Sequence, residues 1–210
     1  GAVKVAVHEL THALGFSGWM YDSYLDSNGD YYDAPYREFT RSGTSAAGNS
    51  YSVDIIELKT PKLMSYARDH FGCTDLEGVE LEDYGGSGTA GSHWELRVAG
   101  DEYMCGYINP SMPVSGLTLS LFEDMGWYKT NIEKAEYWGW GKDQGCGFVQ
   151  DRCESSWPDA DEGYWCTSDS NTLKCTPDHK AKGECHVYVY TNTLPAYYQH
   201  FSNSKVGGGN

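Results

Sequence analysis

The strongest constraint on this chain is a short motif near its start, His8-Glu9-Leu10-Thr11-His12, which reads His-Glu-x-x-His. In a helix, residues four apart lie one turn above each other on the same face, so His8 and His12 would direct two imidazoles at one point. Glu9 would place a carboxylate beside the first of them, within reach of a water on a shared metal ion. This pattern predicts a zinc site with its own general base.

The residues around the motif favour a packed helix. Val3, Val7, Leu10 and Leu14 recur at helical spacing and form an apolar stripe, which predicts packing against another part of the fold. Gly15 follows where such a helix would end, because glycine tolerates the left-handed conformation. A surface helix with two solvated histidines is the plainer interpretation, and this context argues against it.

A catalytic zinc site needs a third protein ligand. His93 is the best candidate, because it follows a glycine-rich segment, 85–92, whose backbone can approach a ligand closely. That segment is not a phosphate loop, since the Gly-Lys-Ser/Thr ending is missing. The residues alone leave four other histidines open as ligands, namely His70, His179, His186 and His200. A lone histidine at the end of a helix, as we expect for His70, is more often a packed residue or a favourable charge than a ligand.

Local signals predict two further helices. Thr60 and Gly72 are start and stop signals for a helix over 61–71, and Ser115 caps a shorter one over 117–125.

Two other segments are less regular. Residues 36–60 are compatible with strands or with loops. Residues 26–30 resemble the start of a calcium loop, but their glycine is at the fourth position and Arg37 occupies the twelfth, so we predict a plain turn.

Composition limits the partners and the class of fold. A hydrophobic content of 40% and an aromatic content of 14% favour a packed globular core. The net charge of −15 argues against nucleic acid or an anionic membrane surface as a partner. No apolar run is long enough to span a bilayer. Because only seven residues precede His8, we expect the sheet on which such a helix normally packs to be missing from this chain.

Cysteine usage indicates an oxidising, extracellular setting. The chain has seven cysteines, five of them between positions 146 and 185, and no Cys-x-x-Cys pair that would indicate a structural zinc ribbon. We therefore interpret them as disulfide-forming. An odd number requires a free thiol or a partner outside the chain. From position 145 onward the composition shifts to Cys, Asp, Ser and Thr, which predicts a small disulfide-held module.

At this point the chain resembles the leishmanolysin family of metzincin zinc peptidases, and the resemblance extends from Gly1 to about Cys185. The segment 8–17 is similar to that family's active-site helix. Most metzincins place their third histidine where this chain has Gly18, whereas leishmanolysins insert a long segment before it. His93 lies 81 residues after His12 and fits that longer spacing. The resemblance therefore implies that His93 is the third zinc ligand.

The segment 101–104, Asp-Glu-Tyr-Met, is similar to the Met-turn of the family. The resemblance implies that Met104 lies beneath the zinc as an apolar floor. Residues 117–128 match the helix that follows in the family.

The resemblance also implies two disulfides, Cys73–Cys146 and Cys166–Cys185. Two cysteines would then need partners beyond the end of this chain, namely Cys153 and Cys175. Cys105, directly after the Met-turn, departs from the family pattern and is either a free thiol or paired with an absent partner.

The implied fold class is α+β, a metzincin-type catalytic fragment followed by a disulfide-rich, mostly irregular module. Residues 1–17 would be the active-site helix that ends an N-terminal catalytic subdomain. Residues 18–150 would form a central subdomain with the third zinc ligand and the Met-turn. Residues 151–210 would begin a cysteine-rich C-terminal domain.

The implied function is that of a zinc-dependent endopeptidase acting on proteins or peptides. One Zn²⁺ per chain would be held by His8, His12 and His93, and Glu9 would activate a zinc-bound water. An extracellular or cell-surface location follows, with membrane anchoring through segments outside this chain left open. The alternative is a catalytically inactive adhesion or binding protein on the same scaffold. The complete set of ligands together with Glu9 argues against that alternative.

Overall fold

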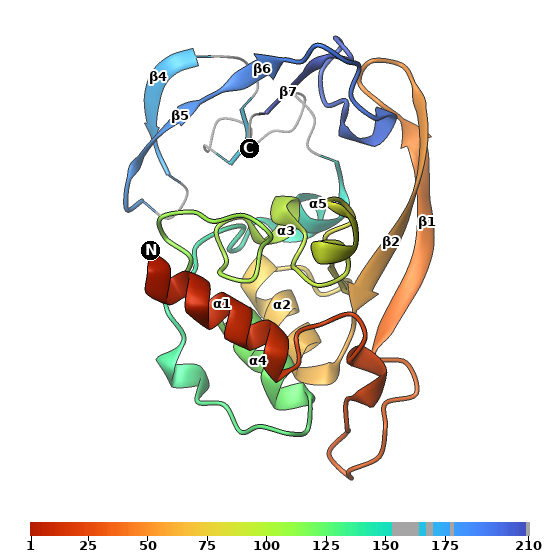
Figure 1. The fold of residues 1–210 in the computed structure, drawn as a ribbon, viewed down its shortest axis with the longest axis vertical. Helices are drawn as coiled ribbons and strands as arrows, with labels where there is room; N and C mark the ends of the chain where they lie inside the picture. The colour runs from red at the N-terminus through yellow and green to blue at the C-terminus, as the bar shows by residue number, and fades with distance from the viewer. Residues whose placement is uncertain (153–163, 167–169, 177–178, 209–210) are drawn as a thin grey trace. The chain divides into compact units, whose positions relative to one another are not determined.

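The computed structural model describes residues 1–152, 164–166, 170–176 and 179–208 (Figure 1). The chain forms two compact units. The first consists of Gly1–Phe39 and Ile55–Asp151, and the second of Thr40–Asp54 and Arg152–Asn210. Helices and strands both contribute, so the predicted α+β class is confirmed. The predicted domain boundaries at 17/18 and 150/151 stay predictions.

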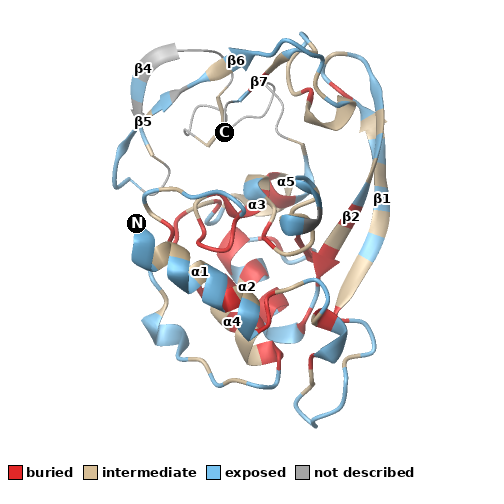
Figure 2. Cartoon of the chain, in the orientation of Figure 1, coloured by how far each residue is buried: buried red, intermediate tan, exposed pale blue. Residues whose placement is uncertain are grey.

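Helices dominate the first unit. Five α-helices belong to it, namely α1 (Ala2–Leu14), α2 (Pro61–Phe71), α3 (Leu96–Ala99), α4 (Gly116–Asp124) and α5 (Gly145–Gln150). Three short 3-10 helices lie between them, η1 (Tyr21–Ser23), η2 (Gly86–Gly88) and η3 (Ile132–Lys134). Helices α2 and α4 pack against each other, and α2 also contacts α5. The core of this unit sits around α2 and α4, where the buried residues gather in Figure 2.

The two predicted helices are confirmed, although the Thr60 side chain makes no capping hydrogen bond to α2. Helix α2 begins after Thr60 with a proline in its first turn and ends at Gly72, which adopts the left-handed conformation (φ 66°, ψ 34°). Four apolar side chains of α2 are buried, those of Leu63, Met64, Ala67 and Phe71. Helix α4 is capped by Ser115, whose hydroxyl accepts a hydrogen bond from the backbone N–H of Leu117 at 3.1 Å.

Helix α1 is present as predicted, but its packing differs from the prediction. The apolar stripe is exposed, with 77% of Val3 and 60% of Leu10 accessible to solvent, and its outer side is pale blue in Figure 2. The only buried residue of α1 is Thr11. The predicted packing of the stripe is therefore not seen among the described residues. The physical reason is that His8 and His12 lie on the opposite side of the helix from the stripe. The face that carries these histidines is the one turned toward the rest of the first unit.

A three-stranded sheet has the order β1-β2-β3, with β1 at Tyr36–Thr44, β2 at Ser50–Leu58 and β3 at Val79–Glu80. Strands β2 and β3 are antiparallel, and Glu57 is paired with Glu80. Of the two alternatives left open for residues 36–60, strands are therefore the one that forms. The segment 26–30 is the predicted plain turn, because the Asp26 carboxylate accepts hydrogen bonds from the backbone N–H groups of Asn28 and Asp30.

The second unit contains two small antiparallel sheets in its described part. Strand β4 (Ser170–Cys175) pairs with β5 (Lys182–Cys185), and β6 (Val187–Val189) pairs with β7 (Val206–Gly208). A short 3-10 helix, η5 (Ala196–Tyr198), precedes the buried Gln199, whose side-chain oxygen accepts hydrogen bonds from Ser45 and Asn49. The described part is thus more regular than predicted. No helix among the described residues has the length and apolar character that crossing a bilayer requires.

The disulfide Cys73–Cys146 is confirmed, and it links the end of α2 to α5 within the first unit. Cys166 is also disulfide-bonded, but the side chain of its predicted partner, Cys185, lies outside what the structure describes. Cys105 and Cys175 carry free thiols, the first buried and the second exposed. The predictions for Cys153 fall outside the described residues.

Candidate metal centre

Three histidine side chains meet in the first unit, two from α1 and one from a distant segment. The Nε2 atoms of His8 and His12 lie 3.1 Å apart, and that of His93 lies 3.1 Å from His8 and 3.2 Å from His12. Three nitrogen ligands at about 2.1 Å from a tetrahedral ion would lie about 3.4 Å apart, so the observed spacing suits a zinc-sized cation. These are also the only histidines in the described chain that belong to a group able to hold a metal ion.

Hydrogen bonds fix which nitrogen of each ring carries the proton. The Nδ1 atom of each ring lies against a backbone carbonyl, that of Tyr103 for His8 (2.6 Å), Phe16 for His12 (2.8 Å) and Thr89 for His93 (2.9 Å). A carbonyl oxygen only accepts, so Nδ1 must donate, and the Nε2 atom of a neutral ring keeps its lone pair. Three lone pairs within 3.2 Å of one another repel, since none of them has a proton to share. A bound cation would turn this repulsion into attraction, so the donor set fits a metal ion.

Burial keeps the third ring neutral. Burial is the largest cause that lowers the pKa of His93 to about 4, and the neighbouring His12 and His8 act in the same direction. The carbonyl of Thr89 and the carboxylate of Glu9 act in the opposite direction. At neutral pH His93 is therefore unprotonated, which is the state in which an imidazole binds metal.

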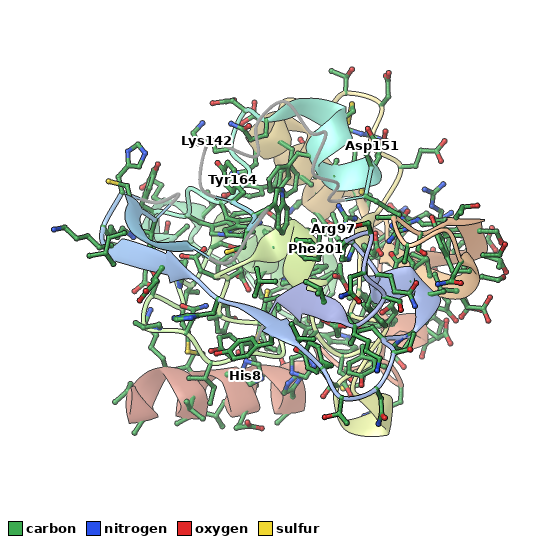
Figure 3. All side chains as sticks on the ribbon, turned by 90° about the horizontal axis from the view of Figure 1, so that it is seen from above. His8, Arg97, Lys142, Asp151, Tyr164 and Phe201 are labelled. Atoms are coloured by element: carbon green, nitrogen blue, oxygen red, sulfur yellow. A yellow bond between two sulfur atoms is a disulfide. The ribbon has the colours of Figure 1, made fainter. Side chains whose placement is uncertain are left out.

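Helix α1 carries His8 and His12, and the segment after its C-terminus supplies the hydrogen-bond partner of His12. Gly15 ends the helix at φ 139°, a backbone conformation that residues with a side chain rarely adopt. The chain then turns so that the Phe16 carbonyl faces His12, while the buried Phe16 ring packs on Trp94 at 4.7 Å between centroids. Figure 3 labels His8 on the side of α1 that faces its own unit.

A network of backbone bonds places the third ring. The N–H of Glu82 donates to the carbonyl of His93, and the N–H of Gly91 donates to the carbonyl of Glu82. Gly106 allows the chain after Met104 to run close by, since a Cβ at this position would lie 2.7 Å from the Thr89 side chain. The glycines on both sides thus permit the close backbone approach that the sequence predicted.

The predicted Met-turn is a buried turn beside the histidines. Met104 is fully buried, and its carbonyl accepts from the N–H of Trp94, the residue after His93. Tyr103, the preceding residue, makes two polar contacts with α1. Its carbonyl accepts from His8, and its hydroxyl lies 3.2 Å from that of Thr11. The position of the Met104 side chain beneath a metal stays a prediction.

A pocket of about 220 Å³ is lined by two of the three histidines, His8 and His93. Glu9 lines it together with His8 and His93, and its carboxylate is exposed. The other lining residues are mostly apolar or small, and are Val5, Gly88, Thr89, Cys105, Gly106, Tyr107, Ile108 and Met112. A substrate group could therefore approach both the rings and a carboxylate from one side.

The other candidate histidines have different surroundings. His70 stacks on Trp138 with ring centroids 4.1 Å apart, and its Nε2 lies 2.8 Å from the carbonyl of Trp140. Burial lowers the pKa of His70, so it is a packed residue of the core, one of the two roles predicted for it. The remaining three, His179, His186 and His200, belong to the second unit.

Comparison with known proteins decides the family. The whole chain, residues 1–210, matches the family model described as Leishmanolysin. This chain belongs to the leishmanolysin family. It is 39% identical over 98% of its length to a leishmanolysin homolog of Crithidia fasciculata, of which it covers 29%. It is 31% identical to the leishmanolysin of Leishmania major over 98% of this chain and 31% of the relative. It is also 31% identical to a leishmanolysin-like peptidase of Drosophila melanogaster, over 96% of this chain and 34% of the relative.

The chain thus spans about a third of the length of the curated leishmanolysin relatives that it matches. The family is one of zinc-dependent metallopeptidases, and its resemblance to this chain, expected from the motifs, is confirmed.

Sequence reasoning missed the groups that orient the rings. The partners of the three Nδ1 atoms are backbone carbonyls, which every residue possesses, so no residue type marks them. Tyr103 and Phe16 could have been suspected only from their closeness to the Met-turn and to the end of α1. Their contribution depends on where the tertiary fold turns their carbonyls.

Proposed function

We propose that this chain carries the catalytic centre of a zinc-dependent endopeptidase. The observation that carries the proposal is the convergence of three imidazole lone pairs on one point, beside the carboxylate of Glu9 in an open pocket. A structural zinc site would use four protein ligands, usually including cysteine, and would have no need of Glu9. Three nitrogen ligands leave a coordination position for chemistry.

His8, His12 and His93 would hold Zn²⁺ through Nε2. When bound, the ion supplies Lewis acidity, which lowers the pKa of a water to about 7 and polarises a carbonyl. The carboxylate of Glu9 accepts the proton of the attacking water and then passes it to the leaving amine of the cleaved peptide. Glu9 lines the same pocket as His8 and His93, which supports this role.

A catalytically inactive adhesion protein on the same scaffold is not favoured. The relatives in Drosophila melanogaster and Caenorhabditis elegans are named peptidases, and this chain keeps the three histidines and the carboxylate. The disulfides favour an extracellular or cell-surface location for the protein. Proteins or peptides would be its substrates.

The decisive test replaces Glu9 in the intact protein. Glu9→Ala should leave zinc content unchanged and lower kcat/KM on a casein-derived peptide by about 10²-fold or more, because it removes the proton acceptor alone. Glu38→Ala is the matched control, since Glu38 is an exposed glutamate of the same unit outside the pocket. Full activity of Glu9→Ala would contradict the mechanism.

A second pair of variants tests whether His93 is the third ligand. His93→Ala should weaken zinc binding by at least about 100-fold in a chelator competition, because a ligand is worth more than the groups that orient it. His179→Ala, which removes an exposed histidine, should leave the affinity unchanged. Equal metal content in the two variants would mean that His93 is not a ligand.

A further inference from the structure

Glu102 is a buried carboxylate that the proposed chemistry does not use. It has no exposed surface, and it directly precedes Tyr103 and Met104 in the turn beside the histidines. Its two oxygens bind different elements. Oε2 accepts from the backbone N–H of Met104 at 2.6 Å, whereas Oε1 accepts from the hydroxyls of Ser115 and Thr118, each at 2.7 Å, at the start of α4. The carboxylate thus bridges the turn and the helix.

The neighbours of Glu102 require it to act as an acceptor. The hydroxyl of Ser115 already accepts from the N–H of Leu117, and that of Thr118 already accepts from the indole N–H of Trp94 at 2.9 Å. Each hydroxyl therefore directs its proton at Glu102, as the N–H of Met104 does. Burial outweighs these donors and raises the pKa of Glu102 to about 7, so above that pH an ionised acceptor faces donors only.

Both ends of this network reach the metal-ligating histidines. The turn that Oε2 holds presents the Tyr103 carbonyl to Nδ1 of His8 at 2.6 Å. The same turn presents the Met104 carbonyl to the backbone N–H of Trp94 at 3.0 Å, next to His93. Thr118 also holds the side chain of Trp94. One carboxylate therefore supports the orientation of His8 and His93, which are 85 residues apart in the sequence.

We propose that Glu102 is a positioning residue of the metal centre, which anchors the Tyr103–Met104 turn to α4 and so sets the orientation of His8 and His93 before metal binds. This rests on the proposed zinc site. No part of it requires Glu102 to contact the metal or the substrate. Groups that orient metal ligands typically contribute a factor of 10 to 100 to metal affinity, so a measurable loss is expected when the anchor is removed.

The substitution Glu102→Gln separates the two halves of the bridge. An amide retains one oxygen for the hydroxyls of Ser115 and Thr118, but its NH₂ group then faces the N–H of Met104, donor against donor. The link to α4 survives and the link to the turn is lost. Glu123→Gln is the matched control, because it makes the same change on a carboxylate of α4 that accepts from Lys62 and Thr130 rather than from the turn.

Zinc affinity, measured at pH 8 by chelator competition in the intact protein, distinguishes the two variants. Glu102→Gln should raise the zinc Kd by about 10-fold or more and change the visible absorption of the cobalt-substituted protein. Glu123→Gln should leave both the Kd and the cobalt spectrum unchanged, because its partners lie outside the Glu102 network. An unchanged Kd and spectrum in folded Glu102→Gln would overturn the proposal, as would equal losses in both variants.

A measurement on the unaltered protein covers the case in which Glu102→Gln does not fold. If the turn is set before metal binds, the amides of Met104 and Trp94 should be protected from hydrogen exchange in the zinc-free protein as well as in the zinc-bound protein. Protection that appears only with zinc would overturn the proposal. If the unaltered protein bound no zinc at all, the proposed function itself would fail, and that result is distinct from an intact zinc site that is insensitive to Glu102.

Discussion

Single residues of one type take different roles in this chain according to what surrounds them. His8, His12 and His93 each donate Nδ1–H to a backbone carbonyl and turn Nε2 toward a common point. His70 instead turns Nε2 toward the carbonyl of Trp140, and its ring is stacked with those of Trp138 and Tyr66. The tautomer, and with it the ability to bind metal, depends on which nitrogen meets a carbonyl.

His70 should make the stability of the protein depend on pH. Burial is the largest cause that lowers its pKa, so the folded state favours the neutral ring. The stability contributed by a neutral His70 is present above the unfolded pKa of about 6.5 and is lost as the pH falls below it. We therefore expect the free energy of unfolding to drop between pH 7.5 and 5.0, and to drop less in His70→Gln, whose amide can still donate to Trp140.

Urea unfolding of both proteins at the two pH values measures this difference. Zinc must be held at the same saturation throughout, so that the three histidines of the proposed metal site contribute equally to both proteins. The same drop in His70→Gln as in the unaltered protein would show that His70 does not contribute.

At the scale of elements, local signals set helix ends reliably, but they do not decide which face of a helix is covered. Helix α2 has its predicted cap residues and its predicted buried face. Helix α1 has its predicted length and stop, yet its apolar stripe faces solvent and its histidine face is turned inward. Periodicity identifies a stripe, whereas the neighbour that covers it is a tertiary property.

Relative to alanine, Gly72 should raise the free energy of unfolding by about 1 kcal/mol through its backbone conformation alone. It is left-handed (φ 66°), and a Cβ there would meet the Cα of Asp143 at an ordinary 3.6 Å, so Gly72→Ala introduces conformational cost without a clash. The matched control is Gly88→Ala, because Gly88 has no positive φ and open space around its Cβ position. Chemical denaturation should show a loss of about 1 kcal/mol for Gly72→Ala and little change for the control. Equal losses would contradict this account.

At the scale of the whole molecule, one disulfide links the helical core across much of the first unit. Cys73 and Cys146 are 73 residues apart, and the loop between them includes His93, the Met-turn and α4. The chain covers about a third of the length of its leishmanolysin relatives. In the described structure, α1 exposes an apolar face that includes Val3 and Leu10.

Removing this disulfide should destabilise the protein substantially. Closing a 73-residue loop lowers the entropy of the unfolded chain by an amount equivalent to about 4 kcal/mol. We expect the double substitution Cys73→Ala and Cys146→Ala to lower the free energy of unfolding by roughly that amount, with a marked fall in Tm. Cys175→Ala, which removes an exposed free thiol, should have little effect. Comparable Tm values for the double variant and the unaltered protein would contradict the expectation.

The sequence by itself determined the residues whose chemistry and spacing are local. The turn of α1 places His8 and His12 on one face, Gly72 ends α2, and Ser115 caps α4. The motif spacing indicates His93 and the Cys73–Cys146 pair through the family resemblance. Only the tertiary structure decided what these groups meet. The carbonyls of Tyr103, Phe16 and Thr89 select the tautomers, and the buried Glu102 joins the Met-turn to α4. The physical reason is that backbone carbonyls and burial have no residue code, so their effect exists only once distant segments are packed together.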